Sequence, residues 1–147
     1  APTALIGGRL GAGVRRGALS LAAEGQAATS PAPSSLTARD RVEATVFSGA
    51  LVPCGHFGLG QLCVVATLGS RTVKALDVDA PASRGALFAV LGVRGGLELS
   101  LSGALALRAN VEVGVPLLRS SYTIDGVSRS TTGLVEGSLG AGLLGRF

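Results

Sequence analysis

The stretch that decides the fold is residues 104–117, ALALRANVEVGVPL, which alternates without a break between two kinds of side chain. One set of alternate positions is apolar: Leu105, Leu107, Ala109, Val111, Val113, Val115 and Leu117. The other set includes Arg108, Asn110 and Glu112. A period of two indicates a β-strand, because successive side chains point to opposite faces of a sheet. A strand that is apolar on one face and charged on the other is typical of a transmembrane barrel, which meets lipid outside and encloses a polar interior.

The composition agrees with a protein that disperses its apolar residues along strands. The chain has 147 residues, which fits a single domain over residues 1–147, and it is 47% hydrophobic and 15% charged. No run reaches the ~18 apolar residues of a spanning helix, whereas a strand crosses with about ten. The net charge of +4 comes from basic residues spread along the chain, without a cluster of Arg and Lys and without a stacking platform of aromatic residues. We therefore expect no nucleic-acid partner.

Alternation recurs along the chain and predicts an all-β protein with seven antiparallel strands. We expect these strands at residues 4–14, 18–28, 41–53, 61–71, 85–101, 104–117 and 133–147. The predicted short connections are a reversal at 15–17, a link through Gly55 and Gly60, and a two-residue turn at Ser102–Gly103. The predicted long polar connections are 29–40, 72–84 and 118–132, and in the last of these Asp125–Gly126 indicates a hairpin. Short periplasmic turns and long extracellular loops alternate in this way in bacterial outer-membrane barrels.

The charged residues follow the phase of these strands. We predict an interior of ion pairs formed by Arg9, Glu24, Arg41, Glu43, Arg94, Glu98, Arg108, Glu112, Glu136 and Arg146. For the strand at 41–53, this phase turns Arg41, Glu43, Thr45 and Phe47 inward and Val42, Ala44, Val46, Ala50 and Val52 outward. Arginine and glutamate confined together can satisfy one another through bidentate pairs. The alternative is a soluble β-barrel or sandwich whose apolar face binds lipid or a protein partner.

The number of strands bears on function. A barrel of about eight strands is just filled by its own side chains. We therefore expect a structural barrel with a plugged interior and extracellular loops available for interaction, and a narrow pore is the second interpretation. Bacterial barrels have even strand numbers, and seven is one short. We expect that the first strand is missing from this sequence and that another chain or segment supplies it.

Cys54 and Cys63 flank the short connection between two predicted strands. We predict that they form a disulfide in the oxidising periplasm. The alternatives are free thiols and a partial metal site that includes His56. His56 is the only histidine, and its predicted position on a turn lies far from the predicted extracellular loops. Because no nucleophile and base are in evidence, we expect neither enzymatic activity nor a cofactor.

The end of the chain carries a family resemblance. Leu139, Ala141 and Leu143 alternate toward a terminal Phe147, which resembles the C-terminal signal read by the barrel assembly machinery in small outer-membrane β-barrels of Gram-negative bacteria. Three longer segments are similar to uncharacterised barrel proteins of myxobacteria: VPCGHFGLGQLC at 52–63, LSGALALRANVEV at 101–113 and GLVEGSLGAGLLGRF at 133–147. The resemblance implies an up-and-down transmembrane barrel in the bacterial outer membrane, with membrane lipid and the assembly machinery as partners. Aromatic residues at the membrane boundary are sparse for such a barrel, with no Trp and only Tyr122 as tyrosine.

Overall fold

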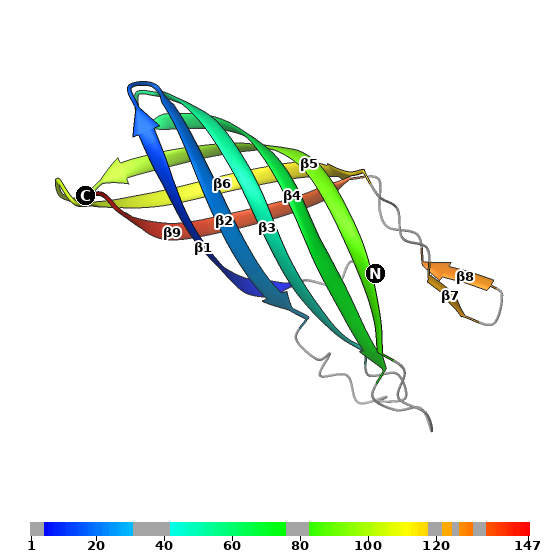
Figure 1. The fold of residues 1–147 in the computed structure, drawn as a ribbon. Helices are drawn as coiled ribbons and strands as arrows, with labels where there is room; N and C mark the ends of the chain where they lie inside the picture. The colour runs from blue at the N-terminus through cyan, green and yellow to red at the C-terminus, as the bar shows by residue number, and fades with distance from the viewer. Residues whose placement is uncertain (1–4, 31–41, 76–82, 118–121, 125–126, 131–134) are drawn as a thin grey trace.

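The computed structural model describes residues 5–30, 42–75, 83–117, 122–124, 127–130 and 135–147 (Figure 1). Its strands are β1 (Ile6–Arg16), β2 (Leu19–Thr29), β3 (Val42–Phe57), β4 (Gly60–Ala75), β5 (Ser83–Ser100), β6 (Leu105–Pro116), β7 (Tyr122–Ile124), β8 (Val127–Ser130) and β9 (Glu136–Gly145). The described part of the chain is all-β, and within it no helix is long and apolar enough to cross a membrane.

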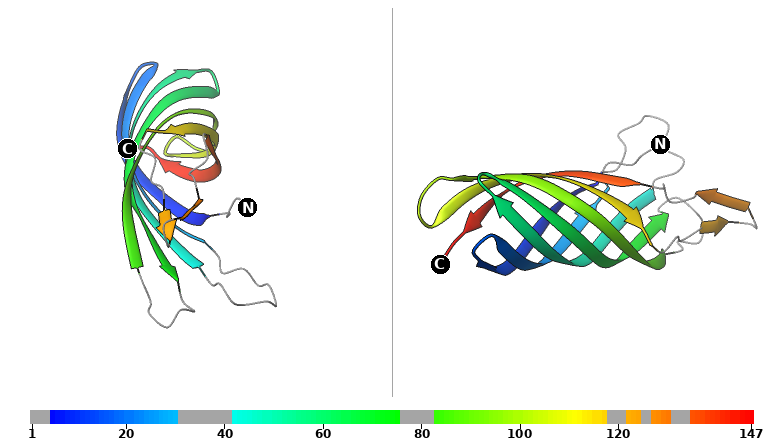
Figure 2. Two further views of the ribbon diagram at one scale, coloured as in Figure 1. Left: turned by 90° about the vertical axis from the view of Figure 1, so that its right-hand side faces the viewer. Right: turned by 90° about the horizontal axis from the view of Figure 1, so that it is seen from above.

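Seven of the strands form one antiparallel sheet in the order β1-β2-β3-β4-β5-β6-β9. Neighbours in the sheet are also neighbours along the chain, apart from the short hairpin of β7 and β8, which forms a separate sheet. The predicted all-β, up-and-down arrangement of seven strands is therefore confirmed. Figure 2 shows the sheet curled into a half-barrel with β1 and β9 at its two free edges.

Two of the three short connections are tight turns that depend on glycine. Gly17 and Gly58 open the turns at 17–18 and 58–59 with φ values of 63° and 60°, a left-handed conformation that costs glycine little. The third connection differs from the predicted two-residue turn. It spans residues 101–104, where the backbone N–H groups of Leu101 and Ser102 donate to the carbonyl of Leu105.

The central strands are longer than predicted. β3 continues to Phe57, β4 continues to Ala75, and β5 begins at Ser83, so that pairing extends into stretches expected to be connections. Backbone hydrogen bonds between strands do not depend on the side chains, so pairing continues where the apolar alternation used for the prediction ends. The hairpin predicted around Asp125–Gly126 is present as β7 and β8, although these two residues lie outside the described ranges.

The alternation of residues 104–117 has the predicted phase. Val111 and Val113 are exposed on the convex face of the curled sheet, which we call the outer face, whereas Arg108 and Glu112 lie on the concave inner face. The apolar residues of β9 share the outer face with those of β6, because directly paired residues point to the same side. The pairs are Ala109 with Ala141, Val111 with Leu139, and Leu107 with Leu143.

The predicted phase of the third strand is wrong. Val52 is 2% exposed and Val46 is also buried, whereas Phe47 is 59% exposed on the outer face. Pairing with β2 sets this phase, since Ala50 lies opposite the inward Glu24. Both faces of β3 are largely apolar, so its own alternation does not distinguish inside from outside. Arg41 and the side chain of Glu43 lie outside the described part of the structure.

Candidate functional site

The inner face of the half-barrel carries two clusters of arginine and glutamate. The register stacks their members, because directly paired residues project on the same side of the sheet. Arg94 of β5 lies opposite Glu112 of β6, and Glu98 of β5 lies opposite Arg108 of β6. These two cross-strand pairs form the centres of the clusters.

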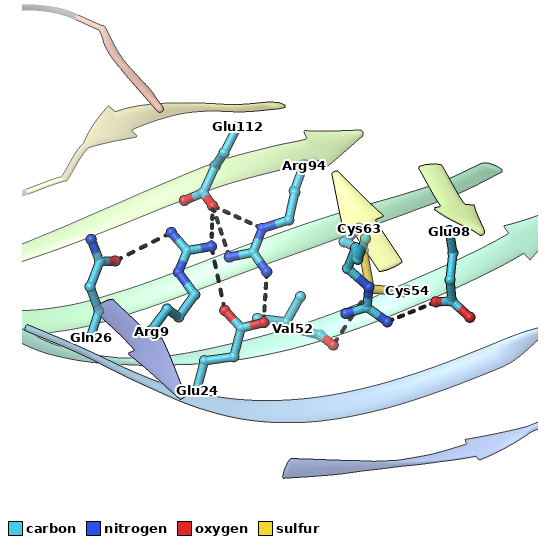
Figure 3. Close-up of polar contacts among 10 residues, drawn as sticks. Arg9, Glu24, Gln26, Val52, Cys54, Cys63, Arg94, Glu98 and Glu112 are labelled. Carbon is cyan, nitrogen blue, oxygen red and sulfur yellow. Dashed lines mark hydrogen bonds and ion pairs between the residues drawn. A yellow bond between two sulfur atoms is a disulfide. The ribbon is translucent and has the colours of Figure 1, made fainter. Parts of the chain in front are cut away.

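The first cluster joins four strands around Arg94, which is only 2% exposed (Figure 3). Its Nη1 lies 2.7 Å from Glu24 Oε1 on β2, and its Nη2 and Nε lie 2.8 and 2.9 Å from Glu112 Oε2. Arg9 of β1 lies over the same carboxylates, with Nη1 3.6 Å from Glu24 Oε2 and 3.4 Å from Glu112 Oε2. Arg9 also donates from Nη2 to Gln26 Oε1 at 3.3 Å. Two guanidinium groups and two carboxylates thus neutralise one another.

The first cluster leaves little space among its own side chains. The cavity that remains beside Arg9, Glu24, Arg94 and Glu112 has a volume of about 10 Å³. A single water molecule needs a cavity of roughly this size or more. The side chains of the first cluster are therefore packed closely against one another.

The second cluster gathers three arginines around one carboxylate. Glu98 accepts from Arg146 and lies 3.0 Å from Arg108, joining Oε2 of the glutamate to Nη2 of the arginine. Nη1 of Arg15 lies 3.9 Å from Glu98 Oε1. Arg146 also donates from Nη1 to Ser100 Oγ at 3.3 Å. This cluster therefore carries two more positive charges than negative ones.

Glu136 has a different partner from the other predicted glutamates. Its Oε1 lies 4.0 Å from Nη2 of Arg71, which reaches across the concave face from β4. Arg71 also stacks over the ring of Phe88, 5.9 Å from the ring centroid.

Sequence reasoning missed Arg15 and Arg71 as members of the interior. The signal was present, because Arg15 shares its alternate positions with the inward Arg9 of β1. Likewise, Arg71 shares its alternate positions with the inward Cys63 of β4. Both arginines lie near strand ends that the predicted boundaries excluded or barely reached.

The predicted disulfide is present. Cys54 and Cys63 are directly paired across β3 and β4, with Cα atoms 4.0 Å apart, and they pack with Val52 and Val65 in a small buried apolar group. Because both sulfurs are bonded to one another, neither is available as a thiolate ligand for a metal. His56 lies in β3 rather than on a turn, and its Nε2 is 2.7 Å from Ser20 Oγ.

The predicted assembly residues lie together at one edge of the sheet. Leu139, Ala141 and Leu143 are exposed on the outer face of β9, and Phe147 follows the end of this strand and is fully exposed. Figure 2 places the C-terminus at the end of the sheet that also carries the short turns.

Comparison of the chain with protein-family models, with curated proteins and with solved structures finds no match.

Proposed function

We propose that this chain forms most of a transmembrane β-barrel in the bacterial outer membrane, with a structural role, a plugged interior and extracellular loops available for interaction. The observation that carries the proposal is the distribution of polarity across the sheet. The outer face is apolar on every one of the seven strands, whereas the concave face holds buried arginine and glutamate. A protein that folds in water normally has the opposite arrangement.

The exposed apolar residues form a continuous belt. Large apolar side chains at the outer face include Leu10, Leu21, Leu51, Leu68, Leu91, Val113 and Leu139, one from each of the seven strands. Removing each such side chain from water contributes about 1.5–3 kcal/mol. Monomeric soluble proteins rarely expose contiguous apolar patches of more than a few hundred Å². Lipid contact removes this belt from water without a second sheet.

The dimensions of the strands suit a bilayer. The seven strands have between 10 and 18 residues, and a tilted strand needs about 9–11 residues to cross the hydrocarbon core. The short turns at 17–18, 58–59 and 101–104 would face the periplasm, and the ends of the strands at Thr29, Ala75 and Pro116 would lead to the extracellular loops. The position of Phe147 at the periplasmic end would suit recognition by the barrel assembly machinery.

The first cluster favours a structural role over a conducting one, because its ion pairs reach from β1 to β6 across the concave face and the cavity among its side chains has a volume of about 10 Å³. Closure needs one strand more. An open sheet edge cannot face lipid, since its backbone N–H and C=O groups would lack partners. We propose that an eighth strand, supplied by another chain or segment, pairs with both free edges.

Reconstitution tests the proposal. The urea-unfolded chain, diluted together with a peptide that supplies an eighth strand, should insert into phospholipid vesicles, resist added protease there, and migrate differently on a gel before and after heating. Planar bilayers containing the inserted protein should show no steady conductance, whereas discrete current steps would support a pore. A monodisperse monomer without detergent would contradict the membrane role altogether.

A further inference from the structure

The two free edges of the sheet limit what can close it. In an antiparallel sheet of seven strands the first and last run in the same direction, so β1 and β9 cannot pair antiparallel with each other. A second copy in the same membrane orientation would also offer each edge a parallel strand. A separate strand of the opposite direction pairs antiparallel with both edges, which continues the existing ladder.

The gap between the free edges of β1 and β9 is called the seam here, and the excess of positive charge among the described residues of the inner face lies beside it. Around Arg94 the charges balance, and Arg71 has its own partner in Glu136. The second cluster has one carboxylate, Glu98, for three guanidinium groups. Two of these three come from the free edges of the sheet, since Arg15 belongs to β1 and Arg146 directly follows β9.

The two edge arginines are the incompletely neutralised members of the cluster. Both contact the same oxygen, Oε1 of Glu98, and their side chains remain 48% exposed for Arg15 and 37% exposed for Arg146. Guanidinium groups that share one acceptor repel one another unless a second anion joins them. A carboxylate that approaches from the seam would reach both.

The seam also has room for an inward side chain at this level. Gly142 of β9 lies opposite Arg108 of β6, and a Cβ added at Gly142 would meet no atom within 4 Å. An incoming strand can therefore place a side chain beside the cluster without displacing β9.

We propose that the seam between β1 and β9 binds a partner strand that carries an inward carboxylate near its amino end, between Arg15 and Arg146. The direction of the strand sets this position, because it runs antiparallel to β1 and therefore begins at the end where Arg15 lies. This inference rests on the closure by an eighth strand proposed above, and it specifies the chemistry of that strand.

A peptide series tests the proposal on the full chain in detergent micelles. The probes are ten-residue fluorescent peptides with leucine and valine at outward positions and serine at inward positions. One glutamate is moved through successive inward positions, and a glutamine peptide matches each. We expect the tightest binding with glutamate near the amino end, and about tenfold weaker binding for its glutamine match, because a charge-assisted hydrogen bond exceeds a neutral one by roughly this factor.

Variants of the chain locate the effect. R15Q and R146Q should each reduce the preference for glutamate over glutamine, whereas R71Q, which removes an inward arginine that pairs with Glu136, should leave it unchanged. Far-UV circular dichroism confirms that each variant retains its strands.

The outcomes are distinct. Equal binding of all peptides would overturn the proposal that the strand carries a carboxylate. Absence of binding would overturn the proposal that a partner strand occupies the seam. Light scattering that shows a closed dimer of this chain would overturn it as well. Failure of the chain to enter vesicles together with its tightest-binding peptide, while the glutamate preference persists in micelles, would reject the proposed membrane role and leave the acidic-strand site standing.

Discussion

Replacing Arg94 by methionine gives the sharpest test of the interior. Methionine is unbranched and fills much of the same space, but it removes the cation that joins β5 to β2 and β6. The change leaves the carboxylates of Glu24 and Glu112 in a largely buried position with Arg9 as their remaining charged partner.

The expected loss follows from the contacts of Arg94. Its three contacts with carboxylate oxygens have lengths of 2.7, 2.8 and 2.9 Å. Removing one partner of a buried ion pair typically costs about 3–5 kcal/mol. Arg9 stays at 3.4 and 3.6 Å from the two carboxylates and takes over part of the pairing. We therefore expect R94M to lower the free energy of unfolding by about 3 kcal/mol, at the lower end of that range.

Urea unfolding in phospholipid vesicles, with the eighth strand supplied as a peptide, measures this loss. Far-UV circular dichroism is the suitable signal, because the chain has no tryptophan. The matched control is R16M at the exposed end of β1, which should change stability by about 0.5 kcal/mol or less. A double-mutant cycle with E112Q should give a coupling energy of about 1 kcal/mol or more. A loss below about 1 kcal/mol for R94M would refute the argument, because pairs of that strength are typical of solvated surfaces.

Three further changes test the disulfide, the outer face and the close approach of two strands. Replacing Cys54 and Cys63 by serine should cost about 2–3 kcal/mol in the same urea titration, because the bond closes a loop with a sequence separation of 9, and an unchanged midpoint would argue against this role. V111R should cost about 2–4 kcal/mol in vesicles, because Val111 is exposed on the outer face, whereas a change of about 0.5 kcal/mol or less would indicate a face in water. G13A should cost about 1–3 kcal/mol, because its Cβ would lie 2.6 Å from the carbonyl oxygen of Leu21. G8A on the same strand meets nothing within 4 Å and should have little effect, and equal melting of the two variants would contradict the close approach of β1 and β2 at Gly13.

Much of the half-barrel was predictable where a strand has two different faces. In β6 one set of alternate positions is wholly apolar and the other contains the charged residues, so the inward direction of Arg108 and Glu112 followed from the chain alone. In β3 both faces are apolar, and the prediction placed Val52 on the wrong side. The inward face of β3 is set by its pairing register with β2, and a register involves two strands rather than one.

The ion-pair partners lay beyond prediction for a related reason. Arg94 and Glu24 are separated by 70 residues, and Arg15 and Arg146 approach the same oxygen of Glu98 from opposite ends of the chain. The alternation of apolar and polar residues along each strand predicts only that these side chains share the concave face. The curvature of the sheet decides which of them come within reach of one another.

The sequence by itself thus determined the all-β class, the number of strands in the sheet, the disulfide and the side of most charged residues. These features depend on the local period of two and on short turns, which neighbouring residues encode. The tertiary structure alone decided the phase of β3, the grouping of charges into two clusters, and the concentration of unbalanced arginine at the free edges. Those features depend on register and curvature, which join residues far apart in the chain.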